Sequence, residues 1–116
     1  MNASKLFKSF TYAFEGIRTA LKQQNMKIHG ICAIAVIIVG LITGLSSIEW
    51  SILLIVIAAV MSLEMVNTAI EAVVDLASPA IHPLAKVAKD VAAGAVLVFA
   101  VASVIIGGLI FLPKWF

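Results

Sequence analysis

The chain has 116 residues, of which 63% are hydrophobic and only 12% are charged, and its formal net charge is +2. An ordinary soluble domain carries about 25% charged residues, so this composition excludes that class. The length fits one domain or one compact bundle, and the single cysteine, Cys32, excludes an intrachain disulfide.

An amphipathic helix is predicted over residues 4–22. Its apolar residues recur at helical spacing, and basic residues fill much of the remaining surface. A basic helix that carries aromatic residues is typical of the lipid interface. We therefore expect this helix to lie on the membrane surface. The alternative, a helix that faces a soluble core, has little soluble mass to pack against.

Three transmembrane helices are predicted over residues 28–45, 51–75 and 84–112. The second is long enough to cross about 30 Å of hydrocarbon at about 1.5 Å per residue. We expect a short turn at residues 46–50, and a proline-containing break at residues 78–83. The sequence therefore predicts an all-α membrane protein with a single domain over residues 1–116.

The distribution of basic residues predicts how the chain crosses the membrane. Seven of the eight Lys and Arg residues lie in the N-terminal segment or in the 76–90 loop, and Lys114 is the exception. The positive-inside rule places such segments in the cytoplasm. We therefore expect a cytoplasmic N terminus and 76–90 loop, with the C terminus outside.

Four polar residues form a stripe inside the second apolar segment: Glu64, Asn67, Glu71 and Asp75. Their spacing places them within an arc of about 80° on one helix face. Carboxylates in a membrane helix are costly, so they are expected to face a protein interior or a wet cavity. We call these four residues the polar stripe. The structural alternative is that they only bond to neighbouring helices.

The chemistry of the polar stripe suits phosphoryl transfer from a soluble donor to a lipid alcohol. Carboxylate oxygens can bind Mg²⁺, which usually arrives with phosphates. The short hairpin should bring Lys86 and Lys89 close to Asp75 and Glu71, where a lysine can neutralise phosphate charge. Glu64, about 16 Å deeper than Asp75 along the helix, could take a proton from a lipid hydroxyl. No Gly-x-x-x-x-Gly-Lys phosphate loop occurs in the sequence.

These motifs resemble the signature of the small integral-membrane diacylglycerol kinase family of bacteria. The resemblance covers nearly the whole chain and rests on residues 12–18, 25–29, 64–75 and 82–96. The Ile-Glu-Trp turn, the His82-Pro pair and the Phe-Leu-Pro-Lys ending are similar to the Gram-positive branch. Members of that branch are typically undecaprenol kinases.

The resemblance implies a homotrimer in the bacterial cytoplasmic membrane that uses ATP and Mg²⁺ to phosphorylate a membrane lipid, with no nucleic-acid partner. By matching position, it implies that Glu64 is the catalytic base and that Glu71 is a Mg²⁺ ligand, with Asn67 and Asp75 in support. It also implies a set of nucleotide-binding residues: Lys5, Tyr12, His82, Lys89 and Asp90. Arg18 is a candidate contact for the lipid substrate, or an anchor for the surface helix.

The chain departs from the family pattern after the surface helix. The family usually has a metal-holding glutamate there, whereas this chain has Gln23 and Gln24. Gln24 remains a candidate metal ligand through a neutral amide oxygen, which carries no charge. We therefore expect weakened metal affinity or a changed metal geometry. His29 is expected to be a polar residue at the membrane boundary rather than a ligand.

The leading functional hypothesis is an undecaprenol kinase, and a diacylglycerol kinase is the alternative within the same class. From another class, a small proton-coupled transporter would use Glu64 and Glu71 to relay protons. That hypothesis does not account for the Ala-Lys-Asp cluster at residues 88–90. A third hypothesis is a non-catalytic assembly subunit.

Overall fold

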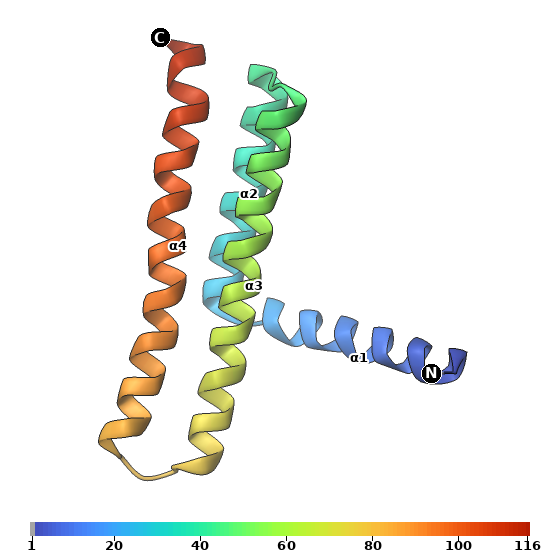
Figure 1. The fold of residues 1–116 in the computed structure, drawn as a ribbon, viewed down its shortest axis with the longest axis vertical. Coiled ribbons are helices and arrows are strands. Elements are labelled where there is room, and N and C mark those ends of the chain that lie inside the picture. Colours follow the sequence, from blue (N-terminus) through green and yellow to red (C-terminus); the bar gives the residue numbers. More distant parts are fainter. Residues whose placement is uncertain (1) are drawn as a thin grey trace.

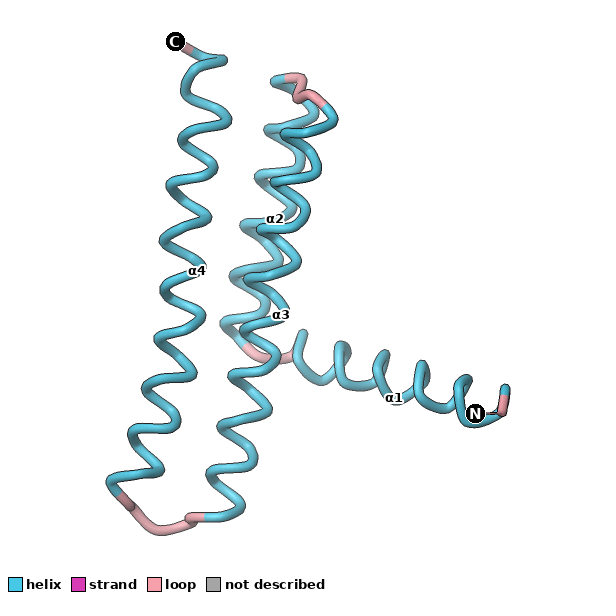
Figure 2. The backbone as a smooth tube through the Cα atoms, in the orientation of Figure 1, coloured by secondary structure: helices cyan, strands magenta, loops and turns pink. Residues whose placement is uncertain are grey.

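The computed structural model describes residues 2–116, and within them every regular element is a helix. The elements are α1 (Ala3–Leu21), α2 (Gln24–Thr43), α3 (Ser47–Ala77) and α4 (Pro83–Trp115). Helices α2, α3 and α4 run alongside one another, whereas α1 projects away from them (Figure 1). Only short loops separate the helices (Figure 2). The all-α prediction is therefore confirmed.

Helices α2, α3 and α4 are long and apolar enough to cross a membrane. Helix α2 has 20 residues, and at about 1.5 Å per residue it matches a hydrocarbon layer of about 30 Å. Helices α3 and α4 have 31 and 33 residues, so they are longer than that layer requires. Their hairpin extends past the level at which α1 joins α2 (Figure 1). The loop between α3 and α4 thus projects beyond the segment that α2 spans.

The predicted turn at residues 46–50 is wrong, because α3 already begins at Ser47. The Oγ atom of Ser46 accepts a hydrogen bond from the Glu49 backbone N–H at 3.2 Å, and the Glu49 carboxylate accepts one from the Ser46 N–H at 3.0 Å. This capping box starts the helix earlier than the apolar run indicates. The actual turn is residues 44–46, and the positive φ of Gly44 (81°) ends α2.

Other helix ends also differ from the predicted ranges. Helix α2 begins at Gln24 rather than at residue 28, because polar residues can form its first turn. Helix α3 ends two residues later than predicted, at Ala77. Helix α4 continues past Pro113 to Trp115, although a proline has no backbone N–H to donate. The N–H of Phe116 donates to the Leu112 carbonyl at 3.0 Å.

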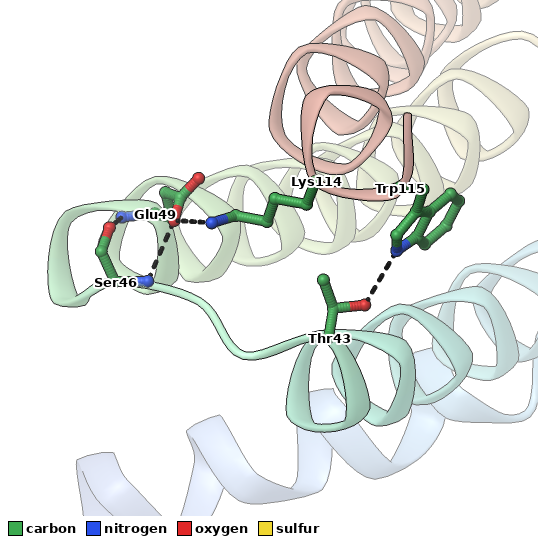
Figure 3. A network of polar contacts seen from close by, with 5 residues as sticks. All are labelled: Thr43, Ser46, Glu49, Lys114 and Trp115. Carbon is green, nitrogen blue, oxygen red and sulfur yellow. Dashed lines mark hydrogen bonds and ion pairs between the residues drawn. The ribbon is translucent and has the colours of Figure 1, made fainter.

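A polar network joins α2, α3 and α4 at the end of the bundle opposite the α3–α4 loop (Figure 3). The Nζ atom of Lys114 on α4 lies 3.0 Å from the carboxylate of Glu49 on α3. The indole N–H of Trp115 donates to Thr43 Oγ1 on α2 at 3.1 Å. These contacts join the ends of α2, α3 and α4 beside the buried apolar cluster.

The apolar core is small compared with the apolar surface. The buried cluster consists of Leu53, Ile110 and Phe111, whereas large apolar side chains are exposed along every helix. In water such a surface would mark a large interaction site. Lipid tails are as apolar as leucine, so the same surface is stable in a bilayer. The exposed faces therefore agree with a membrane protein.

Candidate active site

The polar stripe runs along α3 from a buried end to an exposed end. Glu64 and Asn67 are buried, with 4% and 5% of their surfaces exposed. Glu71 and Asp75, one and two turns farther along, are exposed. The difference arises because α3 passes beyond α2 before it reaches the loop. The stripe therefore connects the bundle interior with the α3–α4 hairpin.

The buried end of the stripe lies against α2. The Nε2 atom of His29 is 3.5 Å from a carboxylate oxygen of Glu64. We expected His29 to be a polar residue at the membrane boundary. The structure also places it in contact with Glu64, the buried end of the polar stripe. One signal could have identified it: His29 is the single residue of the predicted 28–45 span that can carry a positive charge.

Asn67 links the two ends of the stripe. Its Nδ2 group donates to a carboxylate oxygen of Glu71 at 3.2 Å. Its Oδ1 atom is buried and has no hydrogen-bond partner within residues 2–116. A buried acceptor without a partner is costly, so this oxygen is suited to a donor or a cation that arrives with a ligand.

A cavity of about 290 Å³ surrounds the buried end of the stripe. Its walls include Asn25, His29, Glu64 and Asn67, together with apolar residues of α4. Asn25 is a further polar lining residue, and its position in the sequence predicted no role for it. The cavity gives Glu64 space on one side, so the carboxylate is accessible to a reacting group despite its burial.

The exposed end of the stripe meets the start of α4, as predicted. Lys89 forms an ion pair with Asp75 across the hairpin, and Lys86 Nζ lies 2.5 Å from Asp90 Oδ2. His82 is the N-cap of α4, and its Nδ1 atom accepts a hydrogen bond from the Leu84 N–H at 3.1 Å. A pocket of about 290 Å³ brings the polar side chains together; we call it the loop pocket, and it includes Asp75, His82, Lys86, Lys89 and Asp90.

The charges of the loop pocket are available to a ligand. The ion pairs of Lys86 and Lys89 are substantially exposed to solvent. Exposed ion pairs contribute only about 0–1 kcal/mol to stability. Both ammonium groups can therefore turn toward an anionic ligand at low cost.

The candidate residues on α1 are not brought to the polar stripe within one chain. Lys5, Tyr12 and Arg18 are exposed on the helix that projects from the bundle. Gln23, the N-cap of α2, and Gln24, its first residue, are exposed as well. Across residues 2–116, none of these five side chains forms an ion pair or hydrogen bond with the stripe.

The oxygen atoms of the stripe suit Mg²⁺, which needs few protein ligands, better than a metal ion that is coordinated entirely by protein side chains. Within residues 2–116, no three His, Cys, Asp or Glu side chains form a group that could hold a metal ion. Mg²⁺ typically takes one or two carboxylates and fills its remaining positions with waters and phosphates. The exposed Glu71 carboxylate and the unpartnered Asn67 Oδ1 atom fit that requirement.

Comparisons with known proteins agree on one family. The family model described as "Prokaryotic diacylglycerol kinase" matches residues 11–111. The chain is 54% identical to the undecaprenol kinase of Bacillus subtilis (strain 168), over 96% of this chain and 91% of that protein. It is 45% identical to the diacylglycerol kinase of Synechocystis sp., over 96% of this chain and 65% of that protein. It is 28% identical to the diacylglycerol kinase of Escherichia coli (strain K12), over 88% of this chain and 84% of that protein.

Proposed function

The chain belongs to the prokaryotic diacylglycerol kinase family, and from this premise we propose that it transfers the γ-phosphate of ATP to the hydroxyl group of undecaprenol. The observation that carries the choice of lipid is the 54% identity to the Bacillus undecaprenol kinase. Diacylglycerol is the alternative acceptor, because relatives that carry that name also match most of the chain. Both substrates lie in the membrane, in agreement with the three apolar helices.

In the proposed reaction, Glu64 is the general base. Its carboxylate takes the proton of the lipid hydroxyl, and the hydroxyl oxygen forms a bond to the γ-phosphorus of ATP. The bond between that phosphorus and the bridging oxygen breaks, and ADP leaves. The burial of Glu64 supports this role, because a carboxylate there is shielded from water that would compete with the lipid.

The residues of the exposed end bind the nucleotide in this proposal. Lys89 leaves Asp75 to contact the triphosphate, while His82 and Asp90 line the same loop pocket. Glu71, with support from Asn67, would hold Mg²⁺, which would supply positive charge to neutralise the phosphates. Asp75 orients Lys89 when no nucleotide is present.

We further propose that the active enzyme is a homotrimer in the bacterial cytoplasmic membrane. Lys5, Tyr12 and Arg18 lie on α1, away from the loop pocket of the same chain, so a neighbouring subunit can place them beside it. Helix α1 would then lie on the cytoplasmic surface, with the α3–α4 loop on the same side and the C terminus outside. A native mass measurement in detergent tests the proposed subunit number.

We predict that Gln24→Glu increases the affinity for Mg²⁺. An added carboxylate at the start of α2 supplies the charge that a neutral amide lacks. The Mg²⁺ concentration that gives half the maximal rate should fall by about 10-fold, within the range found when groups around a metal are changed. Titration of the rate with Mg²⁺ at fixed ATP measures this. Gln23→Glu is measured in parallel, because the family's glutamate corresponds to one of these two positions. Equal curves for wild type and both variants would contradict the prediction.

The proposed function is tested by phosphate transfer from radiolabelled ATP in vesicles that contain the purified protein. We expect labelled undecaprenyl phosphate, and a higher kcat/KM for undecaprenol than for diacylglycerol in parallel vesicles. A higher value for diacylglycerol would reverse the choice of lipid but keep the reaction. No transfer to either lipid, together with ATP-independent proton flux, would favour the transporter instead.

A further inference from the structure

We propose that His29 is a positioning residue for Glu64. Its Nε2 atom lies beside one carboxylate oxygen of Glu64. In this role an Nε2–H group donates to that oxygen during catalysis, so that the other oxygen faces the hydroxyl group of the lipid. The inference rests on the proposed function, because it assigns a partner to the base of that reaction.

The contact joins two helices inside the bundle. His29 lies on α2 and Glu64 on α3, with 3.5 Å between Nε2 and Oε2. The side chains are 22% and 6% exposed, so the contact is largely shielded from water and from screening by salt. Within residues 2–116, His29 is the only basic residue that pairs with Glu64. A small movement of the imidazole brings the two atoms to hydrogen-bond distance.

Among the residues that line the two cavities beside His29, Glu64 is the acidic residue that can accept a hydrogen bond from the imidazole. The imidazole lines the cavity that contains Glu64, and also an adjoining apolar cavity of about 330 Å³. The α4 residues that line the Glu64 cavity, such as Val96, are apolar. Along α2, Cys32 is the other titratable group that lines the apolar cavity. The imidazole therefore stands at the boundary between the polar and apolar cavities.

The Glu64 carboxylate needs a second group to hold its orientation, because a glutamate side chain without a partner can rotate. Glu64 lines an open cavity, and within residues 2–116 its carboxylate has no hydrogen bond to Asn67 or to any other amide. Rotation of the carboxylate would move the basic oxygen away from the lipid hydroxyl. Small errors in the placement of a reacting group lower the rate strongly. A donor fixed on a neighbouring helix removes one of these rotations.

The inference is tested by two substitutions at the same position. His29→Leu removes the donor, and we expect it to lower kcat by about 10- to 100-fold, the range for a hydrogen bond to a charged group. The KM values for ATP and lipid should stay within about 2-fold of wild type, since His29 is not assigned to binding either substrate. His29→Gln retains an N–H at a similar reach and should recover most of the rate. Cys32→Ala, one turn along α2, is the matched control and should retain the wild-type rate.

A double-mutant comparison separates positioning from a structural role. If His29 acts through Glu64, then His29→Leu should lower the residual rate of a Glu64→Gln enzyme by less than about 2-fold. An equal loss in both backgrounds, or a loss in His29→Leu that His29→Gln does not recover, would overturn the inference. A full rate in His29→Leu would also overturn it. The proposed function itself fails only if the wild-type protein transfers no phosphate to either lipid.

Discussion

Replacement of Glu64 by glutamine should lower the kcat of lipid phosphorylation by about 10²- to 10⁴-fold, the usual contribution of a general base. Glutamine has nearly the same size and can still contact His29, so the packing of α2 against α3 should persist. What it loses is the ability to take a proton from the lipid hydroxyl. The KM for ATP should change little, because the loop pocket lies near the other end of the stripe.

The measurement is the initial rate of phosphate transfer at saturating ATP and lipid. Glu49→Gln is the matched control, since Glu49 is a carboxylate of the same helix that pairs with Lys114 at the opposite end of the bundle. This control should keep the wild-type kcat. A Glu64→Gln enzyme that retained more than a tenth of the wild-type rate would argue against Glu64 as the base.

Replacement of Glu71 by glutamine should raise the Mg²⁺ concentration that gives half the maximal rate by at least about 10-fold. Mutation of residues that contact a metal ligand commonly lowers the metal affinity by about 10- to 100-fold. Loss of a carboxylate that binds the metal directly should lower it at least as much. Glu71 accepts a hydrogen bond from Asn67 and is exposed, so the variant should still fold. The result is read from the rate as a function of Mg²⁺ at a fixed concentration of ATP.

Asp75→Asn provides the comparison for the metal prediction. Asp75 lies one helical turn beyond Glu71 and pairs with Lys89. Its loss should change the KM for ATP through Lys89 but should leave the Mg²⁺ requirement near that of wild type. Identical Mg²⁺ curves for wild type and Glu71→Gln would instead assign the metal to other oxygen atoms.

The two substitutions should affect different steps because the stripe crosses two environments. Glu64 is buried beside α2, where a carboxylate suits proton transfer. Glu71 is exposed, where phosphate, water and Mg²⁺ can all reach it. Seven residues separate them, which is about 10 Å along a helix. One helix face can therefore carry both the acid–base group and the metal-binding group.

Several features of the fold could be predicted from local sequence signals. Three long apolar segments predicted three membrane-length helices, because burial of the backbone in lipid requires internal hydrogen bonds. The loop after Ala77 was also predicted, since two prolines lie in it or directly after it. The start of α3 was missed because the capping box of Ser46 and Glu49 outweighed the polar composition of that segment. The end of α4 was missed because the prediction ended the helix before Pro113, which cannot donate a backbone hydrogen bond, whereas the helix continues to Trp115.

The sequence by itself determined the polar stripe, and only the tertiary structure decided what faces it. A helix repeats every 3.6 residues, so the spacing of Glu64, Asn67, Glu71 and Asp75 alone places them on one face. The contact between His29 and Glu64 depends instead on the rotation and axial offset of α2 against α3. These two quantities are set by side-chain packing between helices and not by the period of either one. For the same reason, only the structure showed that Glu64 is buried against α2, whereas the position of Asp75 beside the α3–α4 hairpin could be predicted from the short loop.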